Sequence, residues 1–185
     1  MTELTGAKTD LRARMMAARD ALPPEFREAA ALALAAKAEL PAFRRLLPEV
    51  GGIVAGYWPI RSEIDPRPLM LELARLGHRL ALPRISETKL VFHAYAPGDD
   101  LVKGPLGTRE PAATSEAVVP GAILTPLLAF DIRGARLGYG KSFYDRAFAD
   151  LPNARRIGLA YRMQQVVAVP REPHDAELDA IFTEI

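Results

Sequence analysis

The chain has 185 residues, of which 49% are hydrophobic and 25% charged, and this is the composition of one ordinary globular domain. It excludes intrinsic disorder and fibrous repeats, and the absence of cysteine excludes disulfides, thiolate metal sites and cysteine nucleophiles. No segment reaches the roughly 18 uninterrupted apolar residues of a membrane span. The first residues also lack the basic-then-apolar layout of a secretion signal. We therefore expect a cytoplasmic monomer without a membrane partner.

Charge is unevenly distributed along the chain, although the formal net charge is only +1. Residues 131–162 contain seven Lys or Arg against three Asp, whereas residues 163–185 contain one Arg against five acidic residues. A nucleic-acid-binding protein usually has a broader basic excess with interleaved aromatic residues, and only 7% of this chain is aromatic. The distribution favours a small phosphorylated ligand with a divalent cation, and no nucleic-acid partner.

Helix and strand patterns alternate along the first half. Apolar residues at helical spacing predict an amphipathic helix over residues 7–21, with Lys8, Arg12 and Arg19 along its edge. The prolines at positions 23 and 24 end this helix, because proline cannot continue one. The patterns that follow predict, in order, a helix over 25–39, a strand over 53–58, a helix over 68–76, strands over 79–82 and 89–94, and a long loop over 97–117.

The second half continues this alternation. It predicts a buried strand over 122–125, a glycine-rich stretch over 134–140, a helix from Phe143 onward, and strands over 156–161 and 180–183. Strands alternating with helices are typical of a sheet whose two faces are both covered. We therefore predict a single α/β domain over residues 1–185, with three layers and a largely parallel, Rossmann-like central sheet.

Residues 136–146, with the sequence RLGYGKSFYDR, carry the strongest chemical signal. Glycine allows the backbone to bend and a ligand to approach it closely, and the helix that follows would present unpaired N–H groups to an anion. Arg136, Lys141 and Arg146 add positive charge suited to phosphate. The alternative is a turn that only caps the helix, since Ser142 and Asp145 have the spacing of a capping box.

This segment resembles the signature of the 5-formyltetrahydrofolate cyclo-ligases, also called methenyltetrahydrofolate synthetases. Five other pieces of the chain resemble that family in the same order. They are Lys8 with Leu11 and Arg12; residues 57–59 followed by 63–65; residues 126–131; His174 with Asp175; and residues 178–183. The resemblance covers nearly the whole chain.

The resemblance implies an enzyme that converts 5-formyltetrahydrofolate, including polyglutamylated forms, and Mg-ATP into 5,10-methenyltetrahydrofolate, ADP and phosphate. Phosphorylation of the formyl oxygen would make it a leaving group, so that N10 of the folate can attack the formyl carbon. The protein then supplies alignment and charge neutralisation rather than a covalent nucleophile. Lys141 and Arg136 would lie nearest to the chemistry.

Site residues follow from the same resemblance. Asp145 and Asp179 would bind Mg²⁺, Trp58 and Glu63 would bind the folate, and Phe92, Tyr95 and Tyr144 would be further walls. The ATP site would comprise Lys8, Arg12, Arg136, Leu137, Gly138, Tyr139, Gly140, Lys141, Ser142, Phe143 and Tyr144. Tyr139, Gly140, Lys141, Ser142 and Phe143 would also touch the folate. Taken without the resemblance, Lys8, Arg12, Glu63 and Asp179 are ordinary surface residues and Trp58 a core residue.

The chain departs from the family pattern at three positions. Ser142 stands where most members have a third glycine, Gly121 where aspartate is frequent, and Thr125 where valine is usual. Two alternatives to the cyclo-ligase therefore remain at this stage. One is a non-catalytic member of the same fold that binds folate or nucleotide, and the other is an α/β enzyme acting on a sugar phosphate or coenzyme A.

Overall fold

The central feature of the computed structural model, which describes residues 2–172 and 175–185, is a six-stranded sheet in the order β10-β9-β6-β1-β2-β3. Five strands run parallel, and β3 is antiparallel to β2. The strands are β1 (Ile53–Ala55), β2 (Arg79–Ser86), β3 (Lys89–Tyr95), β6 (Ala122–Pro126), β9 (Arg155–Leu159) and β10 (Ala180–Phe182). The parallel strands follow one of the two common doubly wound orders, which confirms the largely parallel α/β sheet.

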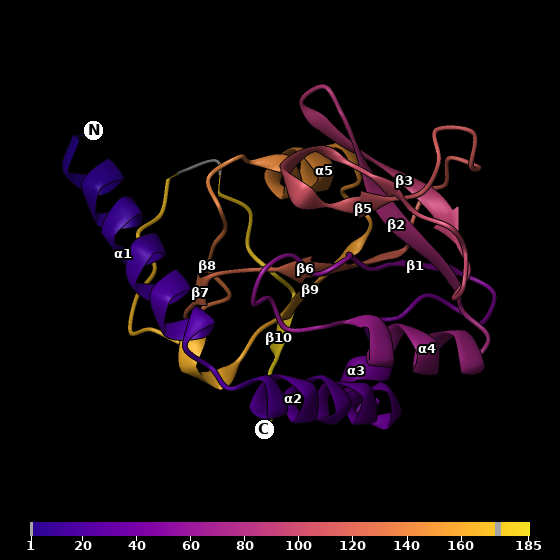
Figure 1. The fold of residues 1–185 in the computed structure, drawn as a ribbon, viewed down its shortest axis with the longest axis horizontal. Helices are drawn as coiled ribbons and strands as arrows, with labels where there is room; N and C mark the ends of the chain where they lie inside the picture. The colour runs from indigo at the N-terminus through magenta and orange to yellow at the C-terminus, as the bar shows by residue number, and fades with distance from the viewer. Residues whose placement is uncertain (1, 173–174) are drawn as a thin grey trace.

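Helices cover both faces of this sheet (Figure 1). Alternate strand residues point to opposite faces, so Val54 and Leu80 pack toward one helical layer while Ala55 and Ala81 pack toward the other. One layer consists of α2 (Pro24–Ala36), the short helix Lys37–Glu39, α3 (Pro41–Arg44) and α4 (Arg67–Arg75). The other contains α5 (Phe143–Asp150). The predicted three layers are confirmed.

The N-terminal helix α1 (Thr2–Asp20) stands at one end of the sheet, apart from the other helices (Figure 1). Its apolar stripe, with Leu11 and Met15, packs on the small antiparallel pair β7 (Ala129–Phe130) and β8 (Arg136–Leu137). Pro24 does not only end the first helix but occupies the first turn of the second, where a proline is tolerated. No helix among the described residues is long and apolar enough to cross a membrane.

Several elements of the structure differ in extent or arrangement from those predicted from the sequence. The strand predicted over 53–58 ends at Ala55, and Tyr57 and Trp58 belong to the connection that follows. Strands β2 and β3 form an antiparallel hairpin closed by residues 87–88. The predicted loop over 97–117 contains a second small antiparallel pair, β4 (Val102–Lys103) and β5 (Arg109–Glu110).

The chain order of the sheet also indicates where a ligand would bind. From β1 the chain passes through α4 to β2 on one side, whereas β6 lies on the other side of β1. In doubly wound sheets the crevice at the carboxyl ends of strands, at such a switch point, is the usual binding place. Tyr57 and Trp58 after β1 and Pro126 at the end of β6 lie at this edge.

Candidate functional site

One cavity of about 600 Å³ lies at this carboxyl edge and contains nearly all the predicted site residues. It is enclosed by α1, the segment after β1, the β2–β3 hairpin, β5, and the bend between β8 and α5. The predicted residues that line it are Lys8, Arg12, Trp58, Glu63, Arg136, Leu137, Gly138, Tyr139, Gly140, Lys141, Ser142, Phe143, Tyr144 and Asp145. Segments far apart in the chain therefore meet at one site.

The glycine-rich bend is built by a buried aspartate before it. Asp131 accepts hydrogen bonds from the N–H groups of Arg133 (2.9 Å), Ala135 (3.3 Å) and Val169 (3.0 Å). Burial acts to raise the pKa of Asp131, but these donors outweigh it and the pKa lies below its ordinary value. The ionised carboxylate closes the turn at 131–135, and this turn returns the chain to the cavity at Arg136.

The two glycines of the bend have different roles. Gly140 has a φ of +84°, and an added Cβ would lie 3.2 Å from the Arg12 guanidinium, so both conformation and space favour glycine. Arg12 reaches the bend from α1 and donates from Nε to the carbonyl of Gly138 (2.9 Å). A Cβ on Gly138 would meet no described atom within 4 Å. The backbone at Gly138 is thus open to a ligand.

The capping box that was the alternative interpretation of this segment does not form at the start of α5. Ser142 adopts a left-handed conformation (φ 52°, ψ 22°), and its hydroxyl makes no capping hydrogen bond with any described residue. Asp145 instead forms an ion pair with Arg136, with 2.7 Å between Oδ1 and a guanidinium nitrogen, and accepts the N–H of Ala176 at 3.3 Å. The left-handed backbone explains why glycine would suit position 142, because an L-residue is strained there.

In the described part of the chain six cationic side chains line the cavity, and Arg146 is not among them: Lys8, Arg12, Arg61, Arg109, Arg136 and Lys141. Arg136 is 8% exposed and stacks at 5.2 Å on the Phe148 ring, and its buried Nε has no hydrogen-bond partner among the described residues. Lys141 is exposed at the rim. Arg146 points elsewhere and donates to the carbonyls of Thr88 and Lys141.

Lys8 is held by two carboxylates that also line the cavity. Its Nζ lies 2.7 Å from Glu172 Oε2 and 2.7 Å from Asp175 Oδ2. Burial acts to lower the pKa of Lys8, but the hydrogen bonds and charges of Asp175 and Glu172 outweigh burial and raise it. Lys8 is therefore a charged, buried side chain, not the surface cation that its place on a helix edge would indicate.

Glu63 is a second buried ionisable side chain, and it lies in the segment after β1. It is 7% exposed and accepts the N–H of Ile60 at 2.9 Å. Burial raises its pKa from 4.5 to about 7, whereas the Ile60 N–H, the charge of Arg19 and a hydrogen bond with Tyr139 act to lower it. Trp58 is half-buried beside it and carries the Arg67 guanidinium over its ring at 4.8 Å.

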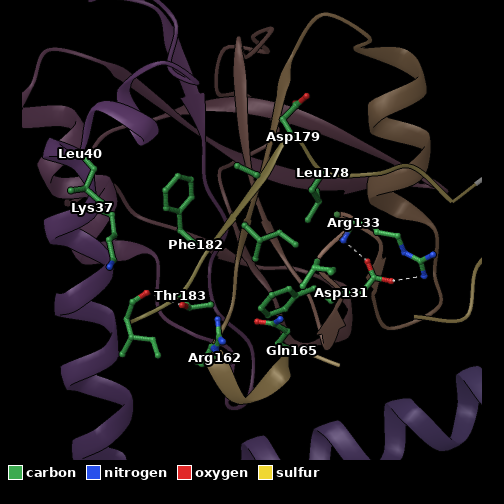
Figure 2. A pocket seen from close by; sticks show the side chains of 16 residues that line it. Lys37, Leu40, Asp131, Arg133, Arg162, Gln165, Leu178, Asp179, Phe182 and Thr183 are labelled. Atoms are coloured by element: carbon green, nitrogen blue, oxygen red, sulfur yellow. Dashed lines mark hydrogen bonds and ion pairs between the residues drawn. The ribbon is translucent and has the colours of Figure 1, made fainter. Parts of the chain in front are cut away.

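Asp179 does not lie in this cavity. It is exposed at the start of β10, where its carboxylate accepts the N–H of Arg156 at 2.7 Å. Asp179 lines a separate depression of about 560 Å³ along the edge strand β10, and Figure 2 shows its carboxylate turned away from the other side chains there. The structure thus separates Asp179 from Asp145. Among the described residues, no group of three or more His, Asp or Glu side chains could hold a metal ion.

Several residues that line the cavity were not predicted from sequence. Asp175 and Glu172 face Lys8, and Asp175 belongs to a motif piece whose other member, His174, lies outside the described residues. Leu106, Thr108, Arg109 and Glu110 show that the predicted loop does reach the site. Of the three residues predicted as further walls, Tyr144 lines the cavity. Phe92 lies in the hydrophobic core instead, and Tyr95 packs against the core.

Comparison with known proteins shows the family to which the chain belongs. The sequence model of the 5-formyltetrahydrofolate cyclo-ligase family matches residues 4–184. The chain belongs to this family. It is 35% identical over 139 residues to the 5-formyltetrahydrofolate cyclo-ligase of Escherichia coli, covering 70% of this chain and 76% of that protein. It is 31% identical over 191 residues to that of Mycolicibacterium smegmatis, covering 96% and 93%.

Solved structures show the same fold in family members. The 5,10-methenyltetrahydrofolate synthetase of Aquifex aeolicus is similar with a TM-score of 0.79 and 31% identity, over 96% of this chain and 89% of that one. The synthetase of Mycoplasma pneumoniae is similar with a TM-score of 0.75 and 25% identity, over 96% and 99%. The family and its members identify the activity as that of a 5-formyltetrahydrofolate cyclo-ligase, an enzyme of folate one-carbon metabolism.

Proposed function

We propose that this member of the family uses Mg-ATP to convert 5-formyltetrahydrofolate into 5,10-methenyltetrahydrofolate, with release of ADP and phosphate. The observation that carries the proposal is the buried Arg136, which lines the same cavity as the open backbone of Gly138 and the acceptor Glu63 and whose Nε has no hydrogen-bond partner among the described residues. A buried cation beside an open glycine backbone suits a phosphate. We further propose one catalytic domain over residues 1–185 that works as a cytoplasmic monomer on free or polyglutamylated folate, without nucleic acid or membrane.

The triphosphate would lie along the bend, between α1 and the first turn of α5. Lys8, Arg12, Arg136 and Lys141 line this part of the cavity and would neutralise its charge. Ser142 and the first residues of α5 also line the cavity, where the first N–H groups of this helix would favour an anion. Residues 136–144 would thus bind the nucleotide as a unit, in agreement with the resemblance of this segment.

Magnesium would be held by Asp145 and Asp175 rather than by Asp145 and Asp179. Asp145 and Asp175 line one cavity, and the N–H of Ala176, next to Asp175, donates to Asp145 at 3.3 Å. Mg²⁺ takes one or two carboxylates and completes its shell with phosphate oxygens and water, so two suffice. When bound, the ion would supply charge neutralisation at the phosphates.

Both ligands could bind without leaving a charge uncompensated if the cations and carboxylates of the cavity exchanged their ion-pair partners for phosphate and metal. We call this change the partner exchange. In the structure Arg136 is paired with Asp145, and Lys8 with Asp175 and Glu172. The phosphates would replace the carboxylates as partners of Arg136 and Lys8. The released carboxylates would then face the metal. This exchange matters because an unpaired buried charge is costly.

The folate would occupy the side of the cavity formed by Tyr57, Trp58 and Glu63. A carboxylate is an acceptor-only group, so Glu63 suits the amino and ring N–H groups of a reduced pterin. The formyl oxygen would then lie at the bend, near Arg136 and Lys141. Its attack on the γ-phosphorus breaks the bond to the ADP oxygen, and N10 attack on the formyl carbon then expels phosphate. The protein aligns the groups and neutralises developing charge.

A direct assay tests this proposal. The purified protein is mixed with 5-formyltetrahydrofolate and Mg-ATP, and the absorbance of the methenyl product is followed. Calorimetry with each ligand separates binding from turnover. Binding of both ligands without methenyl product would leave a non-catalytic binder. A thermal shift with sugar phosphates but not with ATP and folate would favour a different α/β enzyme.

The metal assignment has its own test in a matched pair of variants. Asp175→Asn and Asp179→Asn make the same change four residues apart, one inside the cavity and one outside it. We expect Asp175→Asn to raise the Mg²⁺ concentration for half-maximal activity at least tenfold and Asp179→Asn to leave it within twofold. The reverse order would restore Asp179 as the ligand.

A further inference from the structure

Arg19 is a fully buried charged side chain near the site, although it does not line the cavity. It is 1% exposed. It continues the stripe of α1 that carries Lys8, Arg12 and Met16, all of which line the cavity, by one further turn. At that level Tyr139, which lines the cavity, accepts a hydrogen bond from the Arg19 guanidinium. The guanidinium is thus behind the wall of the site.

The guanidinium connects three segments of that wall. Its Nε donates to Ser62 Oγ at 3.1 Å, one terminal nitrogen reaches the carbonyl of Leu127 at 3.4 Å, and the other donates to the Tyr139 hydroxyl. It also lies 5.7 Å from the centre of the Tyr139 ring. Ser62 precedes Glu63 in the chain, and Tyr139 belongs to the bend. One buried cation therefore joins the folate side to the nucleotide side.

The Tyr139 hydroxyl extends this connection to Glu63. A phenol that accepts a hydrogen bond from a guanidinium still has its own proton to donate, and Tyr139 hydrogen-bonds the Glu63 carboxylate. The chain of donors runs from Arg19 through Tyr139 to Glu63, and each bond polarises the next. The other groups that act on Glu63 are the Ile60 N–H and the Tyr57 and Tyr144 hydroxyls.

We propose that Arg19 is a positioning residue for folate: its buried charge, acting directly and through the Tyr139 hydroxyl, keeps Glu63 an ionised acceptor when the pterin covers it. This inference rests on the proposed function, in which Glu63 binds the pterin. A pterin in the cavity displaces water from Glu63 and adds to the burial that already favours its neutral form. A neutral acid would turn one oxygen into a donor facing the pterin N–H groups. Arg19 opposes this change.

Three variants test the proposal. Arg19→Met removes the charge and the donors, Arg19→Lys keeps the charge, and Tyr139→Phe removes only the connecting hydroxyl. Arg14→Met is the matched control, because Arg14 is an exposed arginine of the same helix. Circular dichroism and thermal unfolding establish which variants are folded before binding is compared.

The first measurement is the titration of the Glu63 carboxyl by ¹³C NMR in ligand-free protein, with Glu63→Gln to assign the signal. We expect a midpoint near 7 in the native chain and in Arg14→Met, and a midpoint about one unit or more higher in Arg19→Met. Tyr139→Phe should shift it in the same direction by less, and Arg19→Lys should stay near the native value. This readout does not depend on catalysis.

The second measurement is the KM for 5-formyltetrahydrofolate between pH 6 and pH 9. At pH 7 we expect Arg19→Met to raise it about fivefold and alkaline pH to restore it, because a rise of the midpoint from about 7 to about 8 lowers the ionised fraction at pH 7 from about one half to about one tenth. The kcat at saturating folate should change far less.

Several results would overturn the inference. An unchanged Glu63 midpoint in folded Arg19→Met, or a KM loss that alkaline pH does not restore, would reduce Arg19 to a structural residue. If Arg19→Met does not fold, Tyr139→Phe decides the question. An unchanged Glu63 midpoint in Tyr139→Phe would then also reduce Arg19 to a structural residue. Failure of the native chain to bind folate, with the titrations as expected, would refute the proposed function and not the link between Arg19 and Glu63.

Discussion

The ion pair between Arg136 and Asp145 should contribute to stability as well as to ATP binding. Their side chains are 6% and 16% exposed and 2.7 Å apart. Removing one partner of a fully buried pair costs about 3–5 kcal/mol, and the partial exposure of Asp145 lowers the expected cost to about 2–3 kcal/mol. Arg136→Met is the suitable change, because methionine keeps an apolar chain against Phe148 while removing the charge. For a chain of this length, about 2 kcal/mol lowers the Tm by roughly 4–8 °C.

A double-mutant cycle isolates this pair. Urea unfolding of Arg136→Met, Asp145→Asn and the double variant gives the coupling free energy, which we expect to be about 1–2 kcal/mol. Calorimetry on the folded single variants gives ATP affinity, where loss of a hydrogen bond to a charged group predicts weakening by about 1–3 kcal/mol for Arg136→Met. Strict additivity of the two changes in unfolding free energy would refute the argument that the pair is a buried, coupled unit.

The remaining predictions concern single positions. Lys141→Ala should weaken ATP binding by about 1–3 kcal/mol and leave the Tm within 1–2 °C of the native value, because Lys141 is exposed; equal loss of stability would show that it is structural. Glu63 has its pKa raised from 4.5 to about 7, so the folded state keeps a proton that the unfolded state releases. The contribution of Glu63 to the free energy of unfolding is full below pH 4.5 and is lost as pH rises through 7, about 3 kcal/mol in all. Glu63→Gln should therefore flatten this part of the pH profile of stability, which urea unfolding measures. Ser142→Gly should unfold at a temperature no lower than the native chain, and Ser142→Val should lose about 1–2 kcal/mol, because φ is 52° at this position. Equal stability of the two Ser142 variants would contradict the left-handed assignment.

The layers and the parallel sheet could be predicted because the required signals are local. Apolar runs of strand length alternate with helical periodicity, and this alternation has few three-dimensional solutions. The β2–β3 hairpin and the β4–β5 pair could not be predicted in the same way. Each pair is closed by a short turn, but the packing of β5 on β2, where Arg84 approaches Glu110 at 3.7 Å, joins residues far apart in the chain, and no local pattern encodes it.

The site was predictable where a motif is continuous and unpredictable where one acidic residue must be chosen from two. Residues 136–145 are adjacent in sequence and all line the cavity. Asp175 and Asp179 are four residues apart and equally acidic, and only the path of the chain decides between them. Residue 176 contacts Asp145, whereas residue 179 joins the sheet beside Arg156. Arg19 had a sequence signal, since it shares the helix edge with Lys8 and Arg12, but nothing local showed that this edge is buried.

The pairing of charges in the cavity leads to a final prediction about how its ligands bind. Phosphates alone would take Arg136 and Lys8 and leave Asp145 and Asp175 as uncompensated anions beside more negative charge. ATP in excess EDTA should therefore bind more weakly than Mg-ATP, with a coupling free energy of about 1–3 kcal/mol. Calorimetry under both conditions measures this difference. The double variant Asp145→Asn with Asp175→Asn should bind ATP nearly equally with and without Mg²⁺, because the two anions are then absent. A native chain that binds ATP equally well in EDTA would show that these carboxylates do not face the phosphates, and the partner exchange would be wrong.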